Sequence, residues 1–404
     1  MRRSLATALC AFAAVLGVWD AAFSGVKPRE PAGRVRFLNH TNAAFDRYSL
    51  SPSGSDQAWM REHYFRMLTY SPYFDTRLQW YPNAWMYKDA YAIRSSWPIF
   101  ASHPEWVLRD VNGNMLYIPW DCSNGVCPQF AADFGNAEFR ANWIREARLS
   151  LAQGYVGLYI DDDNMEWRVS DGNGNAVTPI DPRTRAPMTL ANWRGYFAQF
   201  MEEVRAAFPD VEIVHNAIWY AGGVDDAYIR RQILASDYFN LERGATDAGL
   251  TGGGGRFGFE TFLSFADAVH SLGRGVVLMD YATTIPQREY ALAAWFLHSD
   301  GRDLLMNEQL SWTAPDTWWS GYDLDLGNDQ GKRYSADGVL GRDFSCGTVL
   351  LNQPGMPRRT ITLPSPHRRV DGAQVTSVTL DASTAAILLK DCSAPSPPYD
   401  VRVY

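Results

Sequence analysis

The chain has 404 residues, of which 46% are hydrophobic and 20% charged, and a formal net charge of −8 at pH 7. This length exceeds one small domain, and the composition excludes a disordered or fibrous chain. The acidic balance, without basic runs, argues against nucleic acid as a partner. Aromatic residues reach 14%, with 15 tryptophans, which is more than an ordinary core requires.

The first 24 residues have the pattern of a secretory signal peptide. Arg2 and Arg3 precede a short apolar run, and the small residues Ala22 and Ser24 stand at a candidate cleavage site. The run is shorter than the ~20 residues that a membrane-spanning helix needs. The pattern over residues 1–24 therefore predicts secretion, with no membrane span after cleavage.

Short apolar runs then alternate with segments of helical period. Eight runs are predicted strands: 35–39, 67–71, 84–90, 156–161, 212–217, 238–242, 276–281 and 303–307. Several are apolar throughout their middles, which is typical of parallel strands buried on both faces. Eight strands alternating with helices predict a (β/α)8 TIM barrel over residues 34–325. The alternative, a doubly wound open sheet, usually has a glycine-rich turn after its first strand, and none follows here.

After about residue 330 the pattern changes to short strands separated by turn residues. It predicts a small all-β sandwich domain over residues 332–392, followed by a Pro/Ser-rich tail at 393–404.

Four cysteines follow the signal segment, and an even number in an oxidising compartment indicates two disulfides. Cys122 and Cys127 would close a short loop, and Cys346 and Cys392 would join the ends of the last domain. The alternative is free thiols. A zinc site is disfavoured because the close pair lacks a second close pair and a nearby histidine.

In a (β/α)8 barrel the catalytic groups lie at the carboxyl ends of the strands. The predicted strand ends and the segments beside them supply these candidate substrate-binding residues: Asn39, Lys88, Asp89, Asn164, His215, Asn216, Arg243, Asp280, Tyr281 and Asn307. Loop tryptophans can pack on sugar rings, and Trp120, Trp167 and Trp318 are the candidates. The alternatives are a satisfied core histidine at 215 and tryptophans that only anchor their loops.

Asp161 and Glu242 are the predicted catalytic pair, because each directly follows a strongly apolar strand. Glycoside cleavage needs one carboxyl to protonate the leaving oxygen and another to attack the sugar or activate water. Asp162 and Asp163 are predicted to have supporting or structural roles. Other interpretations are a cap or cation site at residues 161–163 and a plain Glu242–Arg243 ion pair. A separation of ~5 Å would indicate a retaining mechanism and ~6.5–9.5 Å an inverting one.

The sequence contains no serine-hydrolase elbow, zinc-protease motif or nucleotide-binding loop. The four glycines at 252–255 lack the Lys-Ser/Thr that would follow in a phosphate cradle. We therefore expect neither a metal nor an organic cofactor.

The segment Gly154-Tyr-Val-Gly157-Leu-Tyr-Ile-Asp161-Asp162 resembles the fourth strand of several barrel glycosidases. Other matching pieces are 106–110 with Gly113, Asn136 with Arg140 and Trp143, 238–244, and 277–281. Together they resemble secreted glycoside hydrolase-like barrels, in particular hypothetical glycosyl hydrolase family 15, and remotely the endo-α-1,4-polygalactosaminidase family. The catalytic pair of the latter, an Asp after strand four and a Glu after strand six, implies Asp161 and Glu242 here. The three aspartates in a row leave Asp161 versus Asp162 open.

These patterns predict a secreted glycoside hydrolase that acts on a polysaccharide or glycoconjugate. The alternatives are a non-catalytic carbohydrate-binding protein on the same scaffold and a metal-dependent phosphodiesterase built on residues 161–163. The sugar, its linkage and the oligomeric state stay open.

Overall fold

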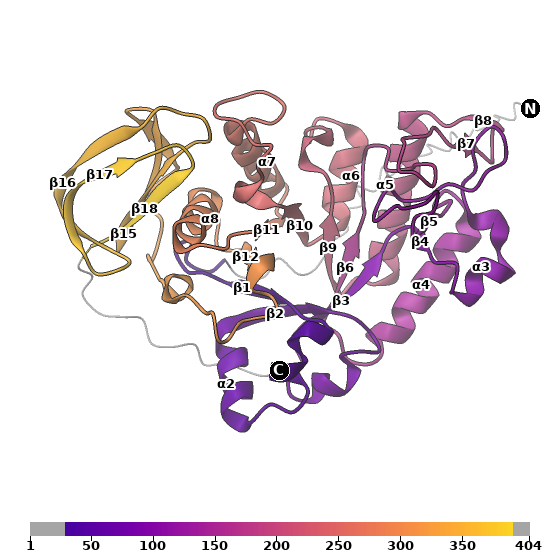
Figure 1. The fold of residues 1–404 in the computed structure, drawn as a ribbon, viewed down its shortest axis with the longest axis horizontal. Helices are drawn as coiled ribbons and strands as arrows, with labels where there is room; N and C mark the ends of the chain where they lie inside the picture. Colours follow the sequence, from indigo (N-terminus) through magenta and orange to yellow (C-terminus); the bar gives the residue numbers. More distant parts are fainter. Residues whose placement is uncertain (1–28, 391–404) are drawn as a thin grey trace, which may run out of the picture.

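The computed structural model describes residues 29–390 (Figure 1). The predicted signal segment, the Pro/Ser-rich tail and Cys392 lie outside the described residues. Within the described range, no helix is both long and apolar enough to cross a membrane.

Eight parallel strands form a closed barrel, which confirms the predicted fold and excludes the open sheet. They are β1 (Phe37–His40), β2 (Tyr64–Thr69), β3 (Ala84–Asp89), β6 (Gly157–Asp161), β9 (Glu212–Asn216), β10 (Tyr238–Glu242), β11 (Gly275–Asp280) and β12 (Leu304–Asn307). Each pairs with the next in chain order, and β12 pairs with β1 to close the barrel.

The apolar middles of the strands are explained by burial on both faces. Along β6, Tyr159 belongs to the cluster that fills the barrel, while Leu158 and Ile160 belong to the cluster under the surrounding helices. Alternation along a strand sends successive side chains to opposite faces. Both faces are covered here, so both sets are apolar.

The longer helices of the outer ring are α2 (Gly54–His63), α4 (Ala137–Leu151), α5 (Leu190–Ala207), α6 (Ala227–Ala235), α7 (Phe259–Ser271) and α8 (Ile285–His298). Side-chain caps fix several of their starts. Asn136 accepts from the backbone of the first turn of α4, and Thr284 forms a capping box with Gln287 on α8.

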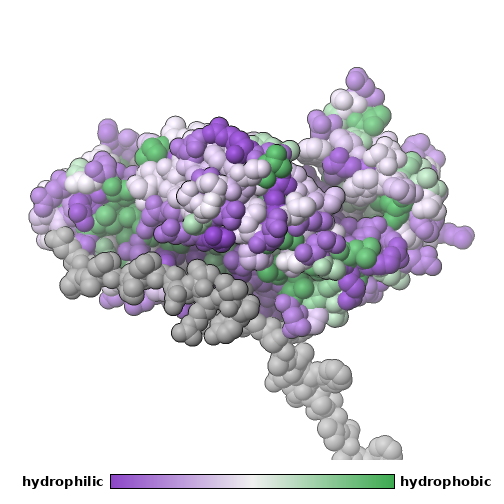
Figure 2. All heavy atoms as spheres, turned by 90° about the horizontal axis from the view of Figure 1, so that it is seen from below, coloured by the Kyte–Doolittle hydropathy of each residue, from purple (hydrophilic) through white to green (hydrophobic). Residues whose placement is uncertain are grey.

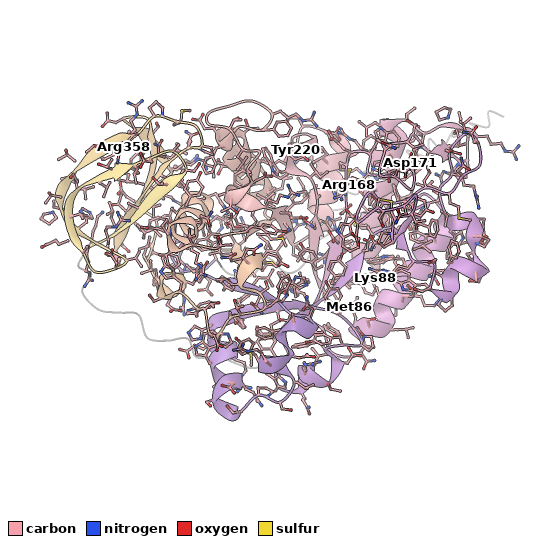
Figure 3. The ribbon with its side chains drawn as sticks, viewed as in Figure 1. Met86, Lys88, Arg168, Asp171, Tyr220 and Arg358 are labelled. Carbon is pink, nitrogen blue, oxygen red and sulfur yellow. A yellow bond between two sulfur atoms is a disulfide. The ribbon has the colours of Figure 1, made fainter. Side chains whose placement is uncertain are left out.

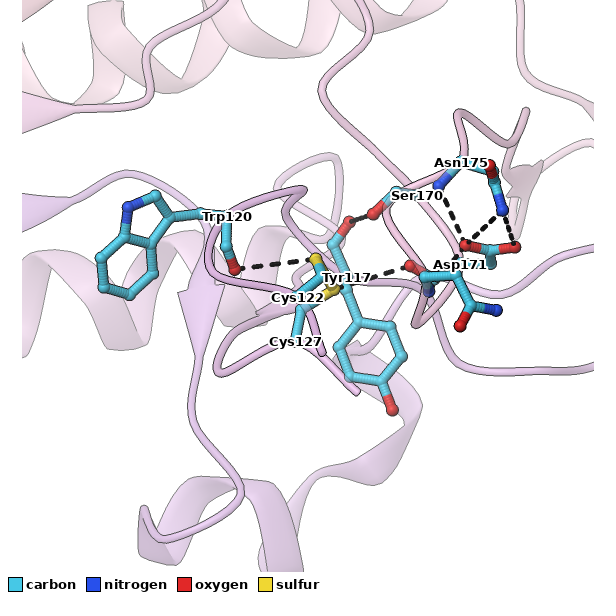
Figure 4. The surroundings of a disulfide bond; sticks show 8 residues. Tyr117, Trp120, Cys122, Cys127, Ser170, Asp171 and Asn175 are labelled. Carbon is cyan, nitrogen blue, oxygen red and sulfur yellow. Dashed lines mark hydrogen bonds between the residues drawn. A yellow bond between two sulfur atoms is a disulfide. The ribbon is translucent and has the colours of Figure 1, made fainter. Parts of the chain in front are cut away.

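The segments that follow β3 and β6 form a small subdomain beside the carboxyl ends of these strands. It contains α3 (Pro98–Ser102) and the short pairs β4 (Ala92–Ile93) with β5 (Phe130–Ala131) and β7 (Ile180–Asp181) with β8 (Ala186–Pro187). The predicted Cys122–Cys127 disulfide is present (Figure 4). The predicted Cys346–Cys392 pair stays a prediction, because Cys392 is not described.

The C-terminal domain is all-β, as predicted. Its strands are β13 (Tyr334–Ala336), β14 (Val339–Phe344), β15 (Gly347–Asn352), β16 (Arg359–Arg369), β17 (Gln374–Leu380) and β18 (Thr384–Leu389), hydrogen-bonded in the order β13-β14-β15-β18-β16-β17. Val378 and Leu380 of β17 share a buried cluster with Leu350 of β15 and Leu388 of β18. The sheet therefore curls until its edge strand covers its own middle strands.

The other face of this sheet packs against α8. Glu289 of α8 is buried, and its carboxylate accepts from the backbone N–H of Ile387 on β18 at 3.1 Å and from Arg369 on β16 at 3.0 Å. Every residue of α8 from Glu289 to His298 is buried. On the face of the molecule shown in Figure 2, hydrophobic residues appear only in scattered patches among polar ones.

Candidate active site

Asp161 and Glu242, the last residues of β6 and β10, share one hydrogen-bond donor. The Asn216 side-chain nitrogen, at the end of β9 between them, donates to Asp161 Oδ1 at 2.7 Å and to Glu242 Oε2 at 3.0 Å. Asn240 donates to the Asn216 carbonyl oxygen at 2.8 Å, so the amide nitrogen faces the two carboxylates. Three adjacent strands thus bring the predicted pair together.

This shared amide limits the distance between one oxygen of Asp161 and one oxygen of Glu242. The two bonded oxygens cannot be farther apart than the sum of the two hydrogen-bond lengths, 5.7 Å. Because the two N–H bonds of a planar amide diverge by about 120°, the oxygens are expected about 5 Å apart. Retaining glycosidases hold their carboxyl groups about 5–5.5 Å apart, and inverting ones about 6.5–9.5 Å.

Asp161 is half-buried and accepts hydrogen bonds on both oxygens. Besides Asn216, the Asp162 backbone N–H donates to Oδ1 at 2.7 Å, and the Tyr87 hydroxyl of β3 donates to Oδ2. Burial, and then the nearby Asp161 charge, raise the pKa of Tyr87 well above its usual value, so the hydroxyl keeps its proton. These donors fix the orientation of the Asp161 carboxylate and stabilise its negative charge.

Glu242 is exposed, and a hydrogen bond to the buried Asp280 holds the loop that follows it. Arg243 adopts a left-handed conformation with φ 65°, and η5 (Gly244–Thr246) follows. The fully buried Asp280 of β11 accepts from the Thr246 backbone N–H at 2.9 Å, and burial raises the pKa of Asp280 to about 7. A Cβ on Gly244 would lie 2.7 Å from this carboxylate, so only glycine fits. Asp280 therefore supports the Glu242 loop.

A cavity of about 430 Å³ opens over the carboxylate pair. It is lined by Asp161, Asp162, Asn164, Glu166, Trp167, Arg168, Asn216, Ala217, Ile218, Trp219, Tyr220, Glu242, Arg243 and Asp247. In Figure 3, Arg168 and Tyr220 lie close together in the view, and Lys88 lies well below them. Aromatic rings beside acids and amides suit a sugar, which has apolar C–H faces and a polar rim.

The three consecutive aspartates point in different directions. Asp162 has φ 57° and contacts Arg168 at 3.1 Å, and burial followed by the Asp161 charge raises its pKa to about 7. Asn164 donates to Asp162 at 3.1 Å. Asp163 is fully buried beside His215, with 3.2 Å between the carboxylate and Nδ1. Three ligands for one cation therefore do not converge here, which disfavours the metal-dependent alternative.

Asp163 and His215 form a buried pair beneath the cavity. Burial raises the pKa of Asp163 to about 8 and lowers the pKa of His215 to about 3, so burial favours the uncharged form of each side chain. His215 does not line the cavity, and the interpretation as a core histidine describes its position.

At β1 and β12, the predicted asparagines are turned away from the cavity. Asn39 is buried and donates to Thr41, and Asn307 bonds to both backbone groups of Ala282. Their neighbours meet instead: His40 Nδ1 lies 2.9 Å from Glu308 Oε1, and its Nε2 lies 3.1 Å from the Tyr70 hydroxyl. Burial raises the pKa of Tyr70 to about 12, and the charges of Asp161 and Glu308 add to this effect.

The remaining predicted residues do not line the cavity over Asp161 and Glu242. Lys88 and Asp89 line a neighbouring cavity behind Tyr87. Tyr281 follows β11 and packs against the cluster that fills the barrel, and burial followed by the nearby Glu242 charge raises the pKa of its hydroxyl. Trp120 is 52% exposed beside the disulfide, and its indole points away from that bond (Figure 4). Trp318 packs on Phe37 and Tyr64, the first residues of β1 and β2, away from the ends that hold Asp161 and Glu242.

The predicted site residues did not include Tyr87, Arg168, Tyr220, His40 and Glu308. Tyr87 could have been found, because it lies one residue before the chosen Lys88 and alternation along β3 allows only one of them to face the barrel. His40 and Glu308 were adjacent to the chosen asparagines in the same way. Arg168 and Tyr220 lie in irregular loops, where periodicity gives no signal.

Within residues 29–390, the side chains that could hold a metal ion are His270, His298 and Asp303. They lie at the ends of α7 and α8 and just before β12, at the opposite end of the barrel from the Asp161–Glu242 pair. The two regions are therefore chemically separate.

Comparisons with solved structures find glycoside hydrolases. The maltogenic α-amylase AmyB from Thermotoga neapolitana is 12% identical, covering 89% of this chain and 99% of its own, with a TM-score of 0.51. The glycoside hydrolase domain of PelA from Pseudomonas aeruginosa is 13% identical, covering 70% and 97%, with a TM-score of 0.43. The GH36 α-galactosidase AgaA from Geobacillus stearothermophilus is 9% identical, covering 89% and 55%, with a TM-score of 0.46. No family model and no curated protein matches the chain. The similarity to AmyB shows a shared fold over most of the chain.

Proposed function

We propose that this protein is a secreted glycoside hydrolase that cleaves a polysaccharide or glycoconjugate with Asp161 and Glu242. The observation that carries the proposal is the single Asn216 amide bound to both carboxylates. It keeps one oxygen of each carboxylate within 5.7 Å of the other, which is compatible with the separation that a retaining mechanism requires. The resemblance of residues 154–162 and 238–244 to barrel glycosidases points to the same two residues, and the Cys122–Cys127 disulfide is compatible with secretion.

The hydrogen bonds support different roles for the two carboxylates. Asp161 accepts from Asn216, Tyr87 and the Asp162 backbone, which suits a nucleophile that must stay charged and correctly oriented. Glu242 is more exposed, and its hydrogen bond comes from Asn216. This suits the acid/base, which must exchange a proton with the leaving group and then with water.

The reaction follows from these roles. An Asp161 oxygen attacks the anomeric carbon as the bond to the leaving oxygen breaks, and Glu242 gives its proton to that oxygen. A covalent glycosyl–Asp161 ester remains. Glu242, now a carboxylate, removes a proton from water, which attacks the same carbon and releases the sugar with its original anomeric configuration. Both carboxylates return to their starting states.

A product screen against cell-wall and exopolysaccharide glycans, followed by NMR of the first-formed anomer, tests the proposal. Asp161→Asn and Glu242→Gln are expected to abolish turnover, and Asp162→Asn separates the two candidate aspartates. Asp210→Asn, at an exposed turn outside the cavity, is the matched control. A 2-fluoro sugar of the active substrate should label Asp161 in the wild-type protein. Full activity in both carboxylate variants would overturn the proposal, and sugar binding without turnover by the wild type would favour a binding protein.

A further inference from the structure

A second cavity adjoins the proposed catalytic cavity on the other side of Tyr87. It has a volume of about 470 Å³ and is lined by parts of β2, β3, the segment after β3 and α4. Tyr87 lines it while donating its hydroxyl to Asp161, and Asp89 lines it as the strand-register partner of Asp161. We name it the Trp97 cavity, after the tryptophan on its rim. The two cavities meet at the Tyr87–Asp161 contact.

Trp97 is not held by the core. Its side chain is 41% exposed, and it contacts no other ring among the residues that the structure describes. Trp143, which also lines the cavity, differs: it is buried, and its indole N–H donates to the Asp89 carbonyl at 2.8 Å. An exposed indole at the rim of a polar cavity is a flat surface on which a sugar ring can stack.

Arg94 lies on the same turn as Trp97. The Trp97 backbone N–H donates to the Arg94 carbonyl at 2.9 Å, which holds the two residues next to each other. Arg94 is exposed, lines the cavity and forms no ion pair within residues 29–390. Lys88 in the same cavity is paired with Glu146 at 3.0 Å. Arg94 therefore keeps its donors available for oxygen acceptors of a ligand.

We propose that the Trp97 cavity is a second sugar-binding subsite. In it, one unit of the substrate stacks on Trp97 and takes no direct part in bond cleavage. Arg94 donates hydrogen bonds to that unit, either to its hydroxyl oxygens or to the carboxylate of a sugar acid. This inference rests on the proposed function. A substrate that occupies both cavities must be long enough to cross Tyr87, so kcat/KM should rise with chain length.

The test measures kcat/KM on oligosaccharides of two to about eight units prepared from the polysaccharide that the product screen identifies. Trp97→Ala is expected to lower kcat/KM at least about tenfold on the longer oligosaccharides and to leave the shortest cleavable one nearly unchanged. Trp97→Tyr should restore most of the loss. Tyr334→Ala is the matched control, because Tyr334 is a similarly exposed aromatic (38%) on the C-terminal sheet. Arg94→Ala measured on neutral and uronic-acid oligosaccharides distinguishes hydroxyl from carboxylate recognition.

The outcomes separate this inference from the proposed function. Equal kcat/KM of wild type and Trp97→Ala at every length would overturn the subsite while leaving the hydrolase intact. If the wild type cleaves nothing, binding of the same lengths of neutral and uronic-acid oligosaccharides to immobilised protein takes the place of kinetics. Binding that strengthens with length and is lost in Trp97→Ala supports the subsite, and binding unaffected by the substitution overturns it. A melting temperature close to wild type for each variant excludes misfolding.

Discussion

The two ends of the barrel both contain charged groups, yet they differ in how these groups are satisfied. At the amino end, Glu212 begins β9 and accepts two bonds from Arg66, at 2.8 and 2.9 Å, and one from the Trp85 indole at 2.7 Å. Arg66 is buried. At the carboxyl end, Glu242 is exposed over a cavity with one amide donor. The hydrogen-bond network around Glu212 stabilises the fold, whereas the exposed carboxylate of Glu242 is available for chemistry.

The largest expected effect contrasts these two glutamates. Glu242→Gln should lower kcat about 10⁴-fold while leaving the melting temperature nearly unchanged, because an exposed side chain is altered. Glu212→Ala should do the reverse and cost about 3–5 kcal/mol of folding free energy, because it leaves the buried Arg66 unpaired. Parallel steady-state assays and urea denaturation check both. A wild-type kcat for Glu242→Gln together with a lowered melting temperature would reverse the comparison.

Asn216→Ala should lower kcat about 10²-fold. The substitution removes the donor that spaces Asp161 and Glu242, a loss comparable to that of one preorganised donor in other active sites. Asn240→Ala is the matched control, since it removes only the partner of the Asn216 carbonyl oxygen and should have a smaller effect. Kinetics on a substrate with an activated leaving group identify which step slows. An unchanged kcat would mean that the separation does not depend on the amide.

Asp163→Asn should change the pH dependence of stability. The pKa of Asp163 is about 8 in the folded protein and near 3.8 when exposed, so the folded state holds a proton that the unfolded state releases. The contribution of Asp163 to the free energy of unfolding therefore falls as pH rises from about 4 to 8, by at most about 1.4 kcal/mol per pH unit.

The contribution of His215 has the opposite pH dependence. Folding lowers the pKa of His215 from 6.5 to about 3, so its contribution to the free energy of unfolding rises with pH in that range. The two slopes offset each other below pH 6.5, so urea unfolding between pH 6.5 and 8 is the informative measurement. There the wild type should lose stability faster than Asp163→Asn. Asp210→Asn, at an exposed position, should keep the wild-type slope. Identical slopes in all three proteins would show that Asp163 is ionised in the folded state.

Tyr87→Phe should give the smallest effect, a loss of about tenfold in kcat. It removes one of three donors to Asp161 and keeps the ring that stacks on Tyr159. Trp85→Phe provides the comparison at the amino end of the barrel, where the lost donor serves Glu212 and the change should appear in stability only. A larger effect of Tyr87→Phe than of Asn216→Ala would show that Asp161 depends more on the Tyr87 hydrogen bond than on the Asn216 hydrogen bond.

The fold could be predicted from the sequence because several barrel strands are apolar on both faces and segments of helical period stand between many of them. The ends of β6 and β10 were found for the same reason, since a carboxylate directly after an apolar run marks the strand end. The orientation at the other strand ends could not be predicted. A shift of one residue in register exchanges Asn39 for His40 and Asn307 for Glu308.

Other side chains depend on contacts distant in sequence. Asp280 ends an apolar strand just as Asp161 does, but it is buried under the η5 turn, which approaches it only in the folded protein. Trp318 is in a loop, as expected of a sugar-binding tryptophan, but it packs on the strand starts. The local sequence pattern does not show that Asp280 contacts the η5 turn or that Trp318 contacts the starts of β1 and β2.

The burial of α8 has a practical consequence for dividing this protein. The helix belongs to the barrel in sequence, yet its outer surface is covered by β15 and β18, and Glu289 accepts a backbone hydrogen bond from the C-terminal sheet. The interface is thus built like the interior of one domain. A protease cut in the connection at residues 326–333 should leave two fragments that stay together on a sizing column, and transplanting the barrel alone would expose an apolar helix to water.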